Sequence, residues 1–519
     1  MLFNSYVFIL GFLPVTAIAF YALGSRGHIR AALTLLVLAS FFFYGWWNPA
    51  YLILIGGSIL FNYAAGRELA RRHAAGISAY WLLVLACAAN LLLIGYYKYA
   101  GFFVENVEAL TGRDYGFEGL VLPLAISFFT FQQIAYLVDA ARGETAEYNF
   151  LHYCLFVTFF PQLIAGPIVH HREMLPQFAR AAIYRPQALR IAVGLSIFIL
   201  GLAKKVLIAD RMAEFATPVF HAADSGMTIT FLDAWMGALT YTFQLYFDFS
   251  GYSDMAIGLA RIFGIRLPLN FNAPYKATGI IEFWRRWHMT LSRFLRDYLY
   301  IPLGGGRVSP VRRQINLMIT MLLGGLWHGA SWNFVLWGGL HGVYLVINHL
   351  WRRLTGRPRF GWIGRRVSVL VTFLAVVFAW VLFRAETLAG AGRIFAGMTG
   401  QNGIAFNIRY LGKFNRMDGL GDWLATQGVR FADDTIHAGS QALNWIAIGL
   451  ILSWAAPTTQ QIFRRFRPAL HTYGEAIGNR LPRLLSWRPS IPWSVAMAVV
   501  ALLCLFRLMA HSEFLYYQF

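Results

Sequence analysis

The chain has 519 residues, of which 58% are hydrophobic, 17% aromatic and only 13% charged. About a quarter of the residues in a soluble protein are charged, so this composition excludes a soluble enzyme with a single anchor and indicates a polytopic membrane protein. The net charge of +20 would suggest nucleic-acid binding in a soluble chain. Cytoplasmic loops of membrane proteins also collect Lys and Arg, so we expect membrane lipids and no nucleic acid as partners.

Apolar runs of membrane-spanning length follow one another along the chain, since a span needs about 20 mostly apolar residues. The first run has no basic segment before it and predicts a retained helix rather than a signal peptide. Segments 150–168 and 188–208 are ambiguous. We therefore predict an all-α polytopic membrane protein with about 11–13 transmembrane helices plus amphipathic and re-entrant helices. The clear candidates are 4–23, 31–47, 51–65, 79–97, 120–138, 226–247, 315–333, 334–350, 367–383, 441–456 and 490–509.

Basic segments give an orientation, because Lys and Arg gather in cytoplasmic loops. Residues 25–30, 67–72, 352–366 and 464–488 are such segments. They predict that the N-terminus and the C-terminus both lie on the non-cytoplasmic side. The count requires that 150–168 is re-entrant and that 188–208 crosses, which leaves Lys204 and Lys205 on the wrong side.

The whole chain, 1–519, reads as a single membrane domain with two long connecting segments. Residues 384–440 form a Gly-rich loop, expected on the non-cytoplasmic side, and 248–314 form a basic, aromatic-rich cytoplasmic insertion. The three cysteines lie far apart in apolar runs without metal-ligand spacing, so we predict core residues and no metal site. No internal repeat is visible, which disfavours the inverted-repeat architecture of many transporters.

Within the basic insertion, residues 280–299 predict one amphipathic helix lying at the membrane interface. His288 falls at the border of its apolar face and is expected to point inward, as a catalytic residue or as an ordinary interfacial histidine. The apolar face comprises Trp284, Trp287, Leu291, Phe294, Leu295 and Tyr298, and the opposite face Arg285, Arg286, Arg293 and Arg296.

Polar residues also occur at the end of the span before this helix. Asp248 and Asp254 belong to YFDFSGYSDMAIG, and Asn270 opens NFNAPY. Polar groups at membrane depth usually face the bundle interior or a cavity, so Asp248 and Asn270 are candidate tunnel or secondary residues. A helix cap or an arginine pair explains either aspartate equally well.

The stretch LLGGLWHGASWN, residues 322–333, places His328 deep in an expected span. Helical spacing would put Gly324, Gly325 and Trp332 beside it, and glycines permit the close approach of a backbone or a substrate. A neutral histidine can act there as a general base or can simply be packed. His341, in WGGLHG, is a second candidate by the same reasoning.

Five motifs together resemble the membrane-bound O-acyltransferases, and more narrowly the bacterial branch with alginate O-acetylase and the D-alanyl transfer protein of teichoic acid synthesis. The resemblance implies tilted helices around a thin, funnelled core with a buried catalytic histidine. That histidine corresponds here to His328 in Trp327-His328-Gly329, and a second one to His288, while His341 becomes secondary. The motifs are EFWRRWH, LLGGLWHGASWN, YFDFSGYSDMAIG, NFNAPY and LPLAISFFTFQQIAYLVDAARG.

The resemblance also implies chemistry. An acyl group, expected to be acetyl, would come from a cytoplasmic donor, acetyl-CoA or an acyl carrier, and would serve O-acetylation of an exopolysaccharide such as alginate. His328 would take the proton of the acceptor hydroxyl during attack on a thioester, with His288 orienting it and no acyl-histidine formed. No covalently bound cofactor is expected, and the location would be the bacterial inner membrane.

The chain ends in EFLYYQF, which resembles the tails of alginate O-acetylase-like proteins. Tyr516 is therefore a candidate acyl acceptor that would pass the group to a periplasmic acetyltransferase, although an aromatic residue of the interfacial belt explains it as well. D-Alanyl transfer to an envelope polymer and a non-enzymatic flippase or transporter subunit remain alternatives. The sequence itself does not identify the polymer.

Overall fold

The protein is described by a computed structural model, in which residues 1–117, 119–145, 149–356, 361–433, 435–436, 440–470 and 481–508 are placed. The described chain is almost entirely helical, and its named strands are the parallel pair β1 (Ala405–Asn407) and β2 (Arg430–Ala432). This confirms the predicted all-α class. Tyr516 lies outside the described residues.

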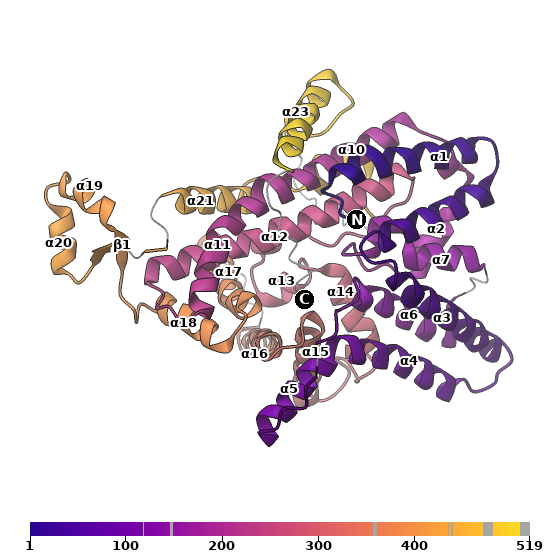
Figure 1. The fold of residues 1–519 in the computed structure, drawn as a ribbon, viewed down its shortest axis with the longest axis horizontal. Helices are drawn as coiled ribbons and strands as arrows, with labels where there is room; N and C mark the ends of the chain where they lie inside the picture. The colour runs from indigo at the N-terminus through magenta and orange to yellow at the C-terminus, as the bar shows by residue number, and fades with distance from the viewer. Residues whose placement is uncertain are drawn as a thin grey trace.

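The N-terminal part consists of hydrophobic helices that lie together at one end of the molecule (Figure 1). The third helix continues past the expected span, so the basic residues 67–72 lie on a helix and not in a loop. In order, the elements are η1 (Val7–Phe12), α1 (Leu13–Ser25), α2 (Ile29–Gly45), α3 (Tyr51–Ala74), α4 (Tyr80–Ile94), the π-helical turn η2 (Gly95–Tyr99), α5 (Ala100–Thr111) and α6 (Ile126–Ala141).

The middle of the chain begins with short helices. The first two, in the ambiguous segment 150–168, are each too short to cross a bilayer. The elements are α7 (Phe150–Thr158), α8 (Phe160–Leu163), α9 (His171–Phe178), η3 (Ala181–Tyr184), α10 (Ala188–Ala203), η4 (Lys204–Ala209), α11 (Asp210–Asp224) and α12 (Phe231–Ile262).

Helix α12 runs through the centre of the molecule (Figure 1), and every residue from Thr240 to Ala260 is buried. The expected span stopped at 247, whereas α12 continues to Ile262, into the segment predicted to be a cytoplasmic insertion. A side chain at Gly258 or Gly251 would lie within 2.7 Å of a carbonyl oxygen of α10. Glycine is required there because the two helix backbones touch.

Lys204 and Lys205 lie inside the bundle and not in a basic loop. Lys204 pairs with Asp254 at 2.5 Å, and Lys205 pairs with Asp248 at 2.8 Å and with Asp210 at 2.7 Å. Buried charges require such partners. The pairs explain how two lysines occupy an apolar segment, and they give Asp248 an electrostatic partner in the core.

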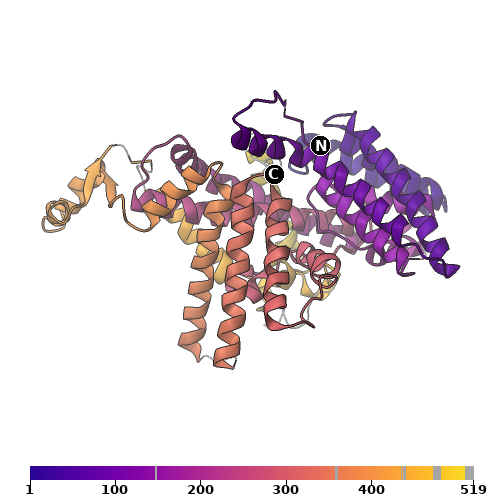
Figure 2. The ribbon, with the colours of Figure 1, turned by 90° about the horizontal axis from the view of Figure 1, so that it is seen from below.

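The C-terminal half contains the long helices that build the site. Helices α15, α16 and α17 stand side by side in Figure 2, with α16 packed against both neighbours. The elements are η5 (Pro274–Lys276), α13 (Ile280–Trp284), α14 (Met289–Leu295), η6 (Arg296–Tyr300), α15 (Pro310–His328), α16 (Trp332–Thr355), α17 (Trp362–Arg384), α18 (Leu388–Met398), η7 (Ile408–Tyr410), α19 (Leu411–Asn415), α20 (Leu420–Thr426), α21 (Gln441–Trp454), α22 (Thr459–Ile462), η8 (Arg464–Phe466), η9 (Arg483–Leu485) and α23 (Ile491–Arg507).

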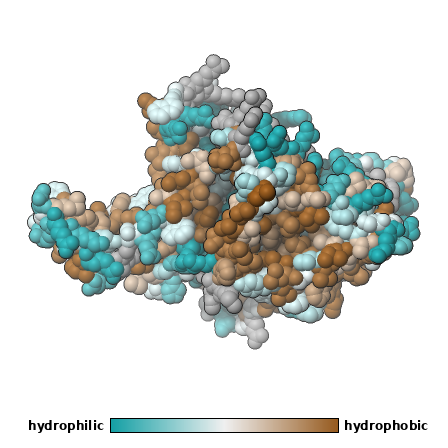
Figure 3. Space-filling model, turned by 90° about the horizontal axis from the view of Figure 1, so that it is seen from above, coloured by the Kyte–Doolittle hydropathy of each residue, from teal (hydrophilic) through white to brown (hydrophobic). Residues whose placement is uncertain are grey.

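The expected loop 384–440 is in fact partly structured. Helix α18 packs back on the bundle, and β1, α19, α20 and β2 form a small unit that projects from one end of the molecule (Figure 1). In Figure 3 this unit is largely hydrophilic, whereas hydrophobic residues cover much of the middle of the same face.

Four helical stretches of the described chain are long and apolar enough to cross a membrane. Several shorter apolar helices accompany them, which agrees with a polytopic protein that contains tilted and broken helices. The long stretches are Val7–Ser25, Tyr80–Thr111, Ala188–Asp224 and Trp362–Arg384, and the shorter ones Ile29–Gly45, Gln441–Trp454 and Ile491–Arg507.

Candidate active site

The fold brings two histidines from different segments together. His328 is the last residue of α15, and His288 precedes α14. Their ring centres are 6.4 Å apart, at an interplanar angle of 61°. His328 is 7% exposed and His288 is completely buried, so a substrate can meet His328 more directly than His288.

Aromatic side chains from three helices hold the His328 ring. The ring centres of Trp337 and Phe383 lie 5.1 and 5.2 Å from it, both in edge-on contact, and that of Trp327 lies 4.9 Å away. Such packing fixes the imidazole, which favours a positioned proton acceptor.

The helix that contains His328 is shorter at its end than the sequence suggested. Gly329, with φ −163° and ψ 151°, terminates α15. Trp332 therefore lies on the next helix rather than one turn beyond His328, and its indole donates to the Asn106 carboxamide oxygen at 2.8 Å. Gly325 performs the expected role, because a Cβ there would lie 2.2 Å from the Phe334 carbonyl oxygen of α16.

The prediction of one continuous amphipathic helix over 280–299 was wrong. The helix breaks between Trp284 and Met289, and His288 adopts the left-handed conformation with φ 42°. A non-glycine residue is strained there, and such strain is concentrated at functional sites. The break turns His288 completely into the protein core, which confirms its predicted inward direction.

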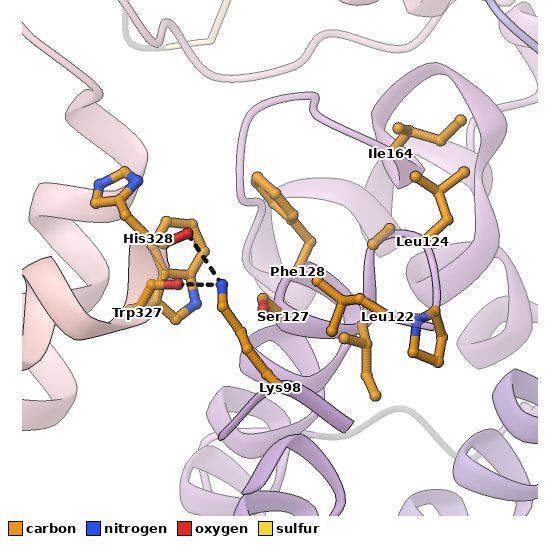
Figure 4. Close-up of a pocket in the computed structure, with 11 residues that line it drawn as sticks. Lys98, Leu122, Leu124, Ser127, Phe128, Ile164, Trp327 and His328 are labelled. Atoms are coloured by element: carbon orange, nitrogen blue, oxygen red, sulfur yellow. Dashed lines mark hydrogen bonds between the residues drawn. The ribbon is translucent and has the colours of Figure 1, made fainter. Parts of the chain in front are cut away.

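A lysine and a tyrosine cap the end of α15. Lys98 Nζ donates to the carbonyl oxygens of Trp327 and His328, at 2.5 and 3.1 Å (Figure 4). The Tyr99 hydroxyl donates to the Leu326 carbonyl oxygen at 2.9 Å. The last carbonyls of a helix have no intrahelical partner, and an apolar environment offers little water to replace one. Lys98 and Tyr99 therefore fix the backbone that carries His328.

Three pockets follow one another along α15. A narrow one of about 40 Å³ is lined by Lys98, Trp327 and His328 at the C-terminal end (Figure 4). A larger one of about 830 Å³ includes Thr320 and Met321 in the middle. A third, of about 370 Å³, reaches Pro310 and Arg313 at the N-terminal end. The 19-residue helix is about 28 Å long at 1.5 Å per residue, so the narrow pocket at His328 and the pocket at Pro310 lie at opposite ends of it.

The third pocket is basic. Four arginines from three segments line it, and no ion pair joins them to a carboxylate within the described ranges. It shares Ile281, Arg285 and His349 with the larger pocket, so the two pockets adjoin. The arginines are Arg285, Arg313, Arg352 and Arg353.

Glu282, in the wall of the larger pocket, is already paired. Its carboxylate accepts from Arg286 at 2.6 Å and from the Thr278 hydroxyl at 2.6 Å. Burial raises the pKa of this carboxyl, but the Thr278 hydrogen bonds and the Arg286 charge outweigh burial and hold the pKa below its ordinary value. Glu282 is therefore a carboxylate near neutral pH, and it offsets the charge of Arg286.

The other predicted site residues have identifiable surroundings. His341 is fully buried among aromatic rings, with Trp337 at 4.9 Å and Trp284 at 5.1 Å between ring centres. Asn270 hydrogen-bonds to His288. Over the described residues, no group of three or more His, Cys, Asp and Glu side chains is arranged to hold a metal ion.

Sequence reasoning missed Lys98 and Tyr99. The expected span 79–97 ended just before them, although the helical stretch runs from Tyr80 to Thr111. A single lysine inside so long an apolar stretch was the available signal, because ionisable residues at membrane depth are costly and are usually functional.

These features define a polytopic helical membrane protein with a buried histidine pair beside a narrow pocket. Residues 124–386 match the model of the membrane-bound O-acyltransferase family. The chain belongs to this family and is an acyltransferase.

The relatives carry specific names. The chain is 45% identical over 431 residues to the peptidoglycan O-acetyltransferase of Helicobacter pylori, covering 78% of this chain and 81% of that protein. It is 41% identical over 422 residues to the probable alginate O-acetylase of Pseudomonas aeruginosa, covering 80% and 77%. It is 27% identical to the teichoic acid D-alanyltransferase of Streptococcus thermophilus, covering 52% and 69%.

Replacing Lys98 by methionine is expected to destabilise the protein and to slow acyl transfer. Each orphaned buried carbonyl costs about 1–3 kcal/mol, and a shift of about 1 Å in a catalytic group can cost about 100-fold in rate. Thermal unfolding in detergent and the transfer rate per folded molecule measure the two effects. Tyr99→Phe removes one hydrogen bond from the same cap and should show a smaller effect. Equal effects of both variants would contradict a dominant role for Lys98.

Proposed function

We propose that this enzyme takes an acyl group, acetyl by resemblance, from a cytoplasmic thioester donor and transfers it for O-acetylation of an exopolysaccharide. The observation that supports this most strongly is the buried His328–His288 pair beside the narrow pocket, with a basic pocket at the other end of α15. An enzyme whose donor and acceptor come from opposite faces needs a site that both can reach. The corresponding location is the bacterial inner membrane, with both termini on the non-cytoplasmic side.

We propose that the reaction is direct transfer. The acceptor hydroxyl oxygen attacks the thioester carbonyl carbon while a His328 nitrogen takes the hydroxyl proton. The tetrahedral intermediate then collapses, the C–S bond breaks, and the thiolate leaves with the proton held on His328. No bond forms between the acyl group and the imidazole, and no cofactor stays bound.

The basic pocket is our candidate for the donor's entrance. Arg285, Arg313, Arg352 and Arg353 present positive charge without carboxylates, which suits the phosphates of acetyl-CoA or of a carrier protein's phosphopantetheine arm. The pocket adjoins the larger one, which is lined by Thr290, two residues from His288, and by Met321 on α15. The thin arm of such a donor matches this path.

Substituting Arg313 by glutamine is expected to raise the KM for acetyl-CoA about tenfold or more, with kcat little changed. A hydrogen bond to a charged group contributes about 1.5–3 kcal/mol. Arg26→Gln makes the same charge change at another exposed basic segment and serves as the control. Acetyl-pantetheine lacks the phosphates and should show the same KM in both variants. A KM for acetyl-pantetheine that also rises in the Arg313 variant would refute a phosphate contact.

Support for the acceptor comes from the relatives rather than from the residues that line the pockets. We propose that a periplasmic acetyltransferase completes the reaction on the polymer, with Tyr516 as the hydroxyl that receives the acyl group. The relatives named for peptidoglycan and alginate acetylation support an envelope or secreted polymer. The teichoic acid relative supports D-alanyl transfer as a second candidate.

Proteoliposomes that contain the purified protein test the function. The donor, acetyl-CoA labelled differently in the acetyl and adenine groups, is supplied on one side, and hydroxyl acceptors on the other. An acetyltransferase moves only the acetyl label onto the acceptor, whereas a flippase or transporter moves both labels. A D-alanyl-charged carrier replaces acetyl-CoA in a parallel assay, and preferential use of that carrier would favour the second candidate.

A further inference from the structure

Asn270 occupies the centre of a hydrogen-bond network behind the histidine pair. It is completely buried, and its side-chain oxygen lies 3.2 Å from His288 Nδ1. The same oxygen lies 3.3 Å from the Thr290 backbone nitrogen and 3.0 Å from the Thr290 hydroxyl. The Asn270 side-chain nitrogen donates to the Ser253 hydroxyl at 3.3 Å.

This network fixes which end of the Asn270 amide faces His288. A backbone N–H can only donate, so the side-chain atom that faces the Thr290 nitrogen must be the oxygen. The Thr290 hydroxyl accepts the Ile168 backbone N–H at 3.0 Å, which leaves its own hydrogen for Asn270. Because His288 Nδ1 faces an oxygen acceptor, Nδ1 must carry the ring hydrogen.

The hydrogen-bonding role of the other ring nitrogen of His288, Nε2, follows from this. A neutral imidazole has one N–H and one lone pair, so Nε2 is an acceptor. Nε2 is buried and has no hydrogen-bond partner in the described part of the chain. Rings nearby in the described chain are those of Phe249, Trp327, His328 and Phe271, with centres at 4.7, 6.2, 6.4 and 6.5 Å. Trp327 and His328 each carry an N–H that can donate a hydrogen bond, and of the two only His328 can also take a proton.

The distance between the two imidazoles shows whether they can form a direct hydrogen bond. A direct hydrogen bond places two imidazole centres at most about 5.3 Å apart, from about 3.0 Å between nitrogens and two ring radii. The observed 6.4 Å is longer than this, and it lies within the range allowed by one oxygen hydrogen-bonded to both rings.

We infer that Asn270 is a positioning residue that locks His288 as the Nδ1–H tautomer, so that Nε2 accepts a hydrogen bond from His328 through one bridging oxygen. The N–H of His328 is held in this bond, and its remaining nitrogen is left unprotonated to take the acceptor's proton. A second residue that orients a base is a recurrent arrangement in acyl transfer. The inference rests on the proposed function for the identity of the proton donor.

The structure supports this division of roles through accessibility. His328 retains 7% exposure and lines the narrow pocket, whereas His288 and Asn270 have none. Asn270 and His288 therefore act through His328 and do not touch the substrate themselves.

Three variants test the positioning role. Asn270→Leu should lower kcat about tenfold or more with the donor KM unchanged, as loss of the partner that orients a histidine does at metal sites, where it costs about 10- to 100-fold. Asn270→Asp keeps an acceptor oxygen, so it should retain more activity than Asn270→Leu and shift the acidic limb of the pH–rate profile. Asn62→Leu removes another buried asparagine, one paired with Asn90 away from the site, and should lower stability without changing kcat per folded molecule.

A purely structural role predicts a different pattern. The charged aspartate would then be at least as harmful as leucine, and activity would follow the folded fraction in all three variants. That result would overturn the inference.

Nitrogen-15 NMR of histidine-labelled protein tests the tautomer without any assay of activity. The His288 signals, identified by their loss in His288→Gln, should show a protonated Nδ1 and an unprotonated Nε2. Asn270→Leu should change that pattern. The reverse tautomer in the wild-type protein would overturn the inference, even if acyl transfer were confirmed. Conversely, the expected tautomer in a protein without acyl transfer would refute only the proposed function.

Discussion

Replacing His328 by glutamine is expected to reduce acyl transfer by about 100- to 10,000-fold, the range that general acid–base catalysis contributes. Glutamine has nearly the volume of histidine and can hydrogen-bond, but it cannot take a proton at neutral pH. The aromatic contacts with Trp337 and Phe383 should therefore keep the variant folded. Mass spectrometry of the secreted polymer, with the purified enzyme assayed in parallel, measures the loss.

Variants of two further histidines serve as comparisons for this prediction. His221→Gln changes an exposed histidine on α11 and should behave as wild type. His341→Gln changes a buried one in the same aromatic cluster and should mainly lower stability. An equal loss of kcat in the His341 and His328 variants would contradict the assigned roles. An acyl group trapped on His328 would contradict direct transfer.

Replacing Gly325 by alanine is expected to lower stability by about 1–3 kcal/mol, as overpacking commonly does, and to reduce activity. The new Cβ would lie 2.2 Å from the Phe334 carbonyl oxygen and 3.1 Å from the Gly338 Cα. Helices α15 and α16 would have to separate, and His328 is only three residues away. Thermal unfolding in detergent and the transfer rate measure both effects.

The matched control for this variant is Gly56→Ala. Gly56 also lies within a helix, α3, and no atom comes within 4 Å of a Cβ built there. Alanine is the better helix former by up to about 1 kcal/mol, so this variant should be as stable as wild type or slightly more stable. Equal stability of the Gly325 and Gly56 variants would contradict the proposed close helix contact.

The family motifs and the buried histidines could be identified from the sequence, but the ends of the helices around them could not. Periodicity predicted one helix across 280–299, because hydrophobic spacing does not register a left-handed residue such as His288 at the break. For the same reason, the sequence pattern extended the helix that contains His328 to Trp332. Helix ends depend on local backbone geometry, which periodicity does not encode.

Buried ion pairs are a second feature that the sequence did not predict. Lys204 and Lys205 looked like the end of a span, since a basic pair in an apolar run usually marks an interface. Their carboxylate partners Asp254 and Asp248 lie about 45 residues further along the chain, on α12. Only the folded arrangement of α12 against η4 reveals that these charges cancel inside the bundle.

The sequence by itself determined the membrane class, most of the apolar helices and the family, and it made His328 a candidate catalytic residue. These properties reside in composition, in runs of about 20 residues and in contiguous motifs. The tertiary structure alone decided that the ring centres of His328 and His288 lie 6.4 Å apart, that Lys98 caps the helix that ends at His328, and that Asn270 hydrogen-bonds to His288. The physical reason is that each of these contacts joins segments well separated along the chain, and side-chain hydrogen bonds of that kind leave no periodic signal in the sequence.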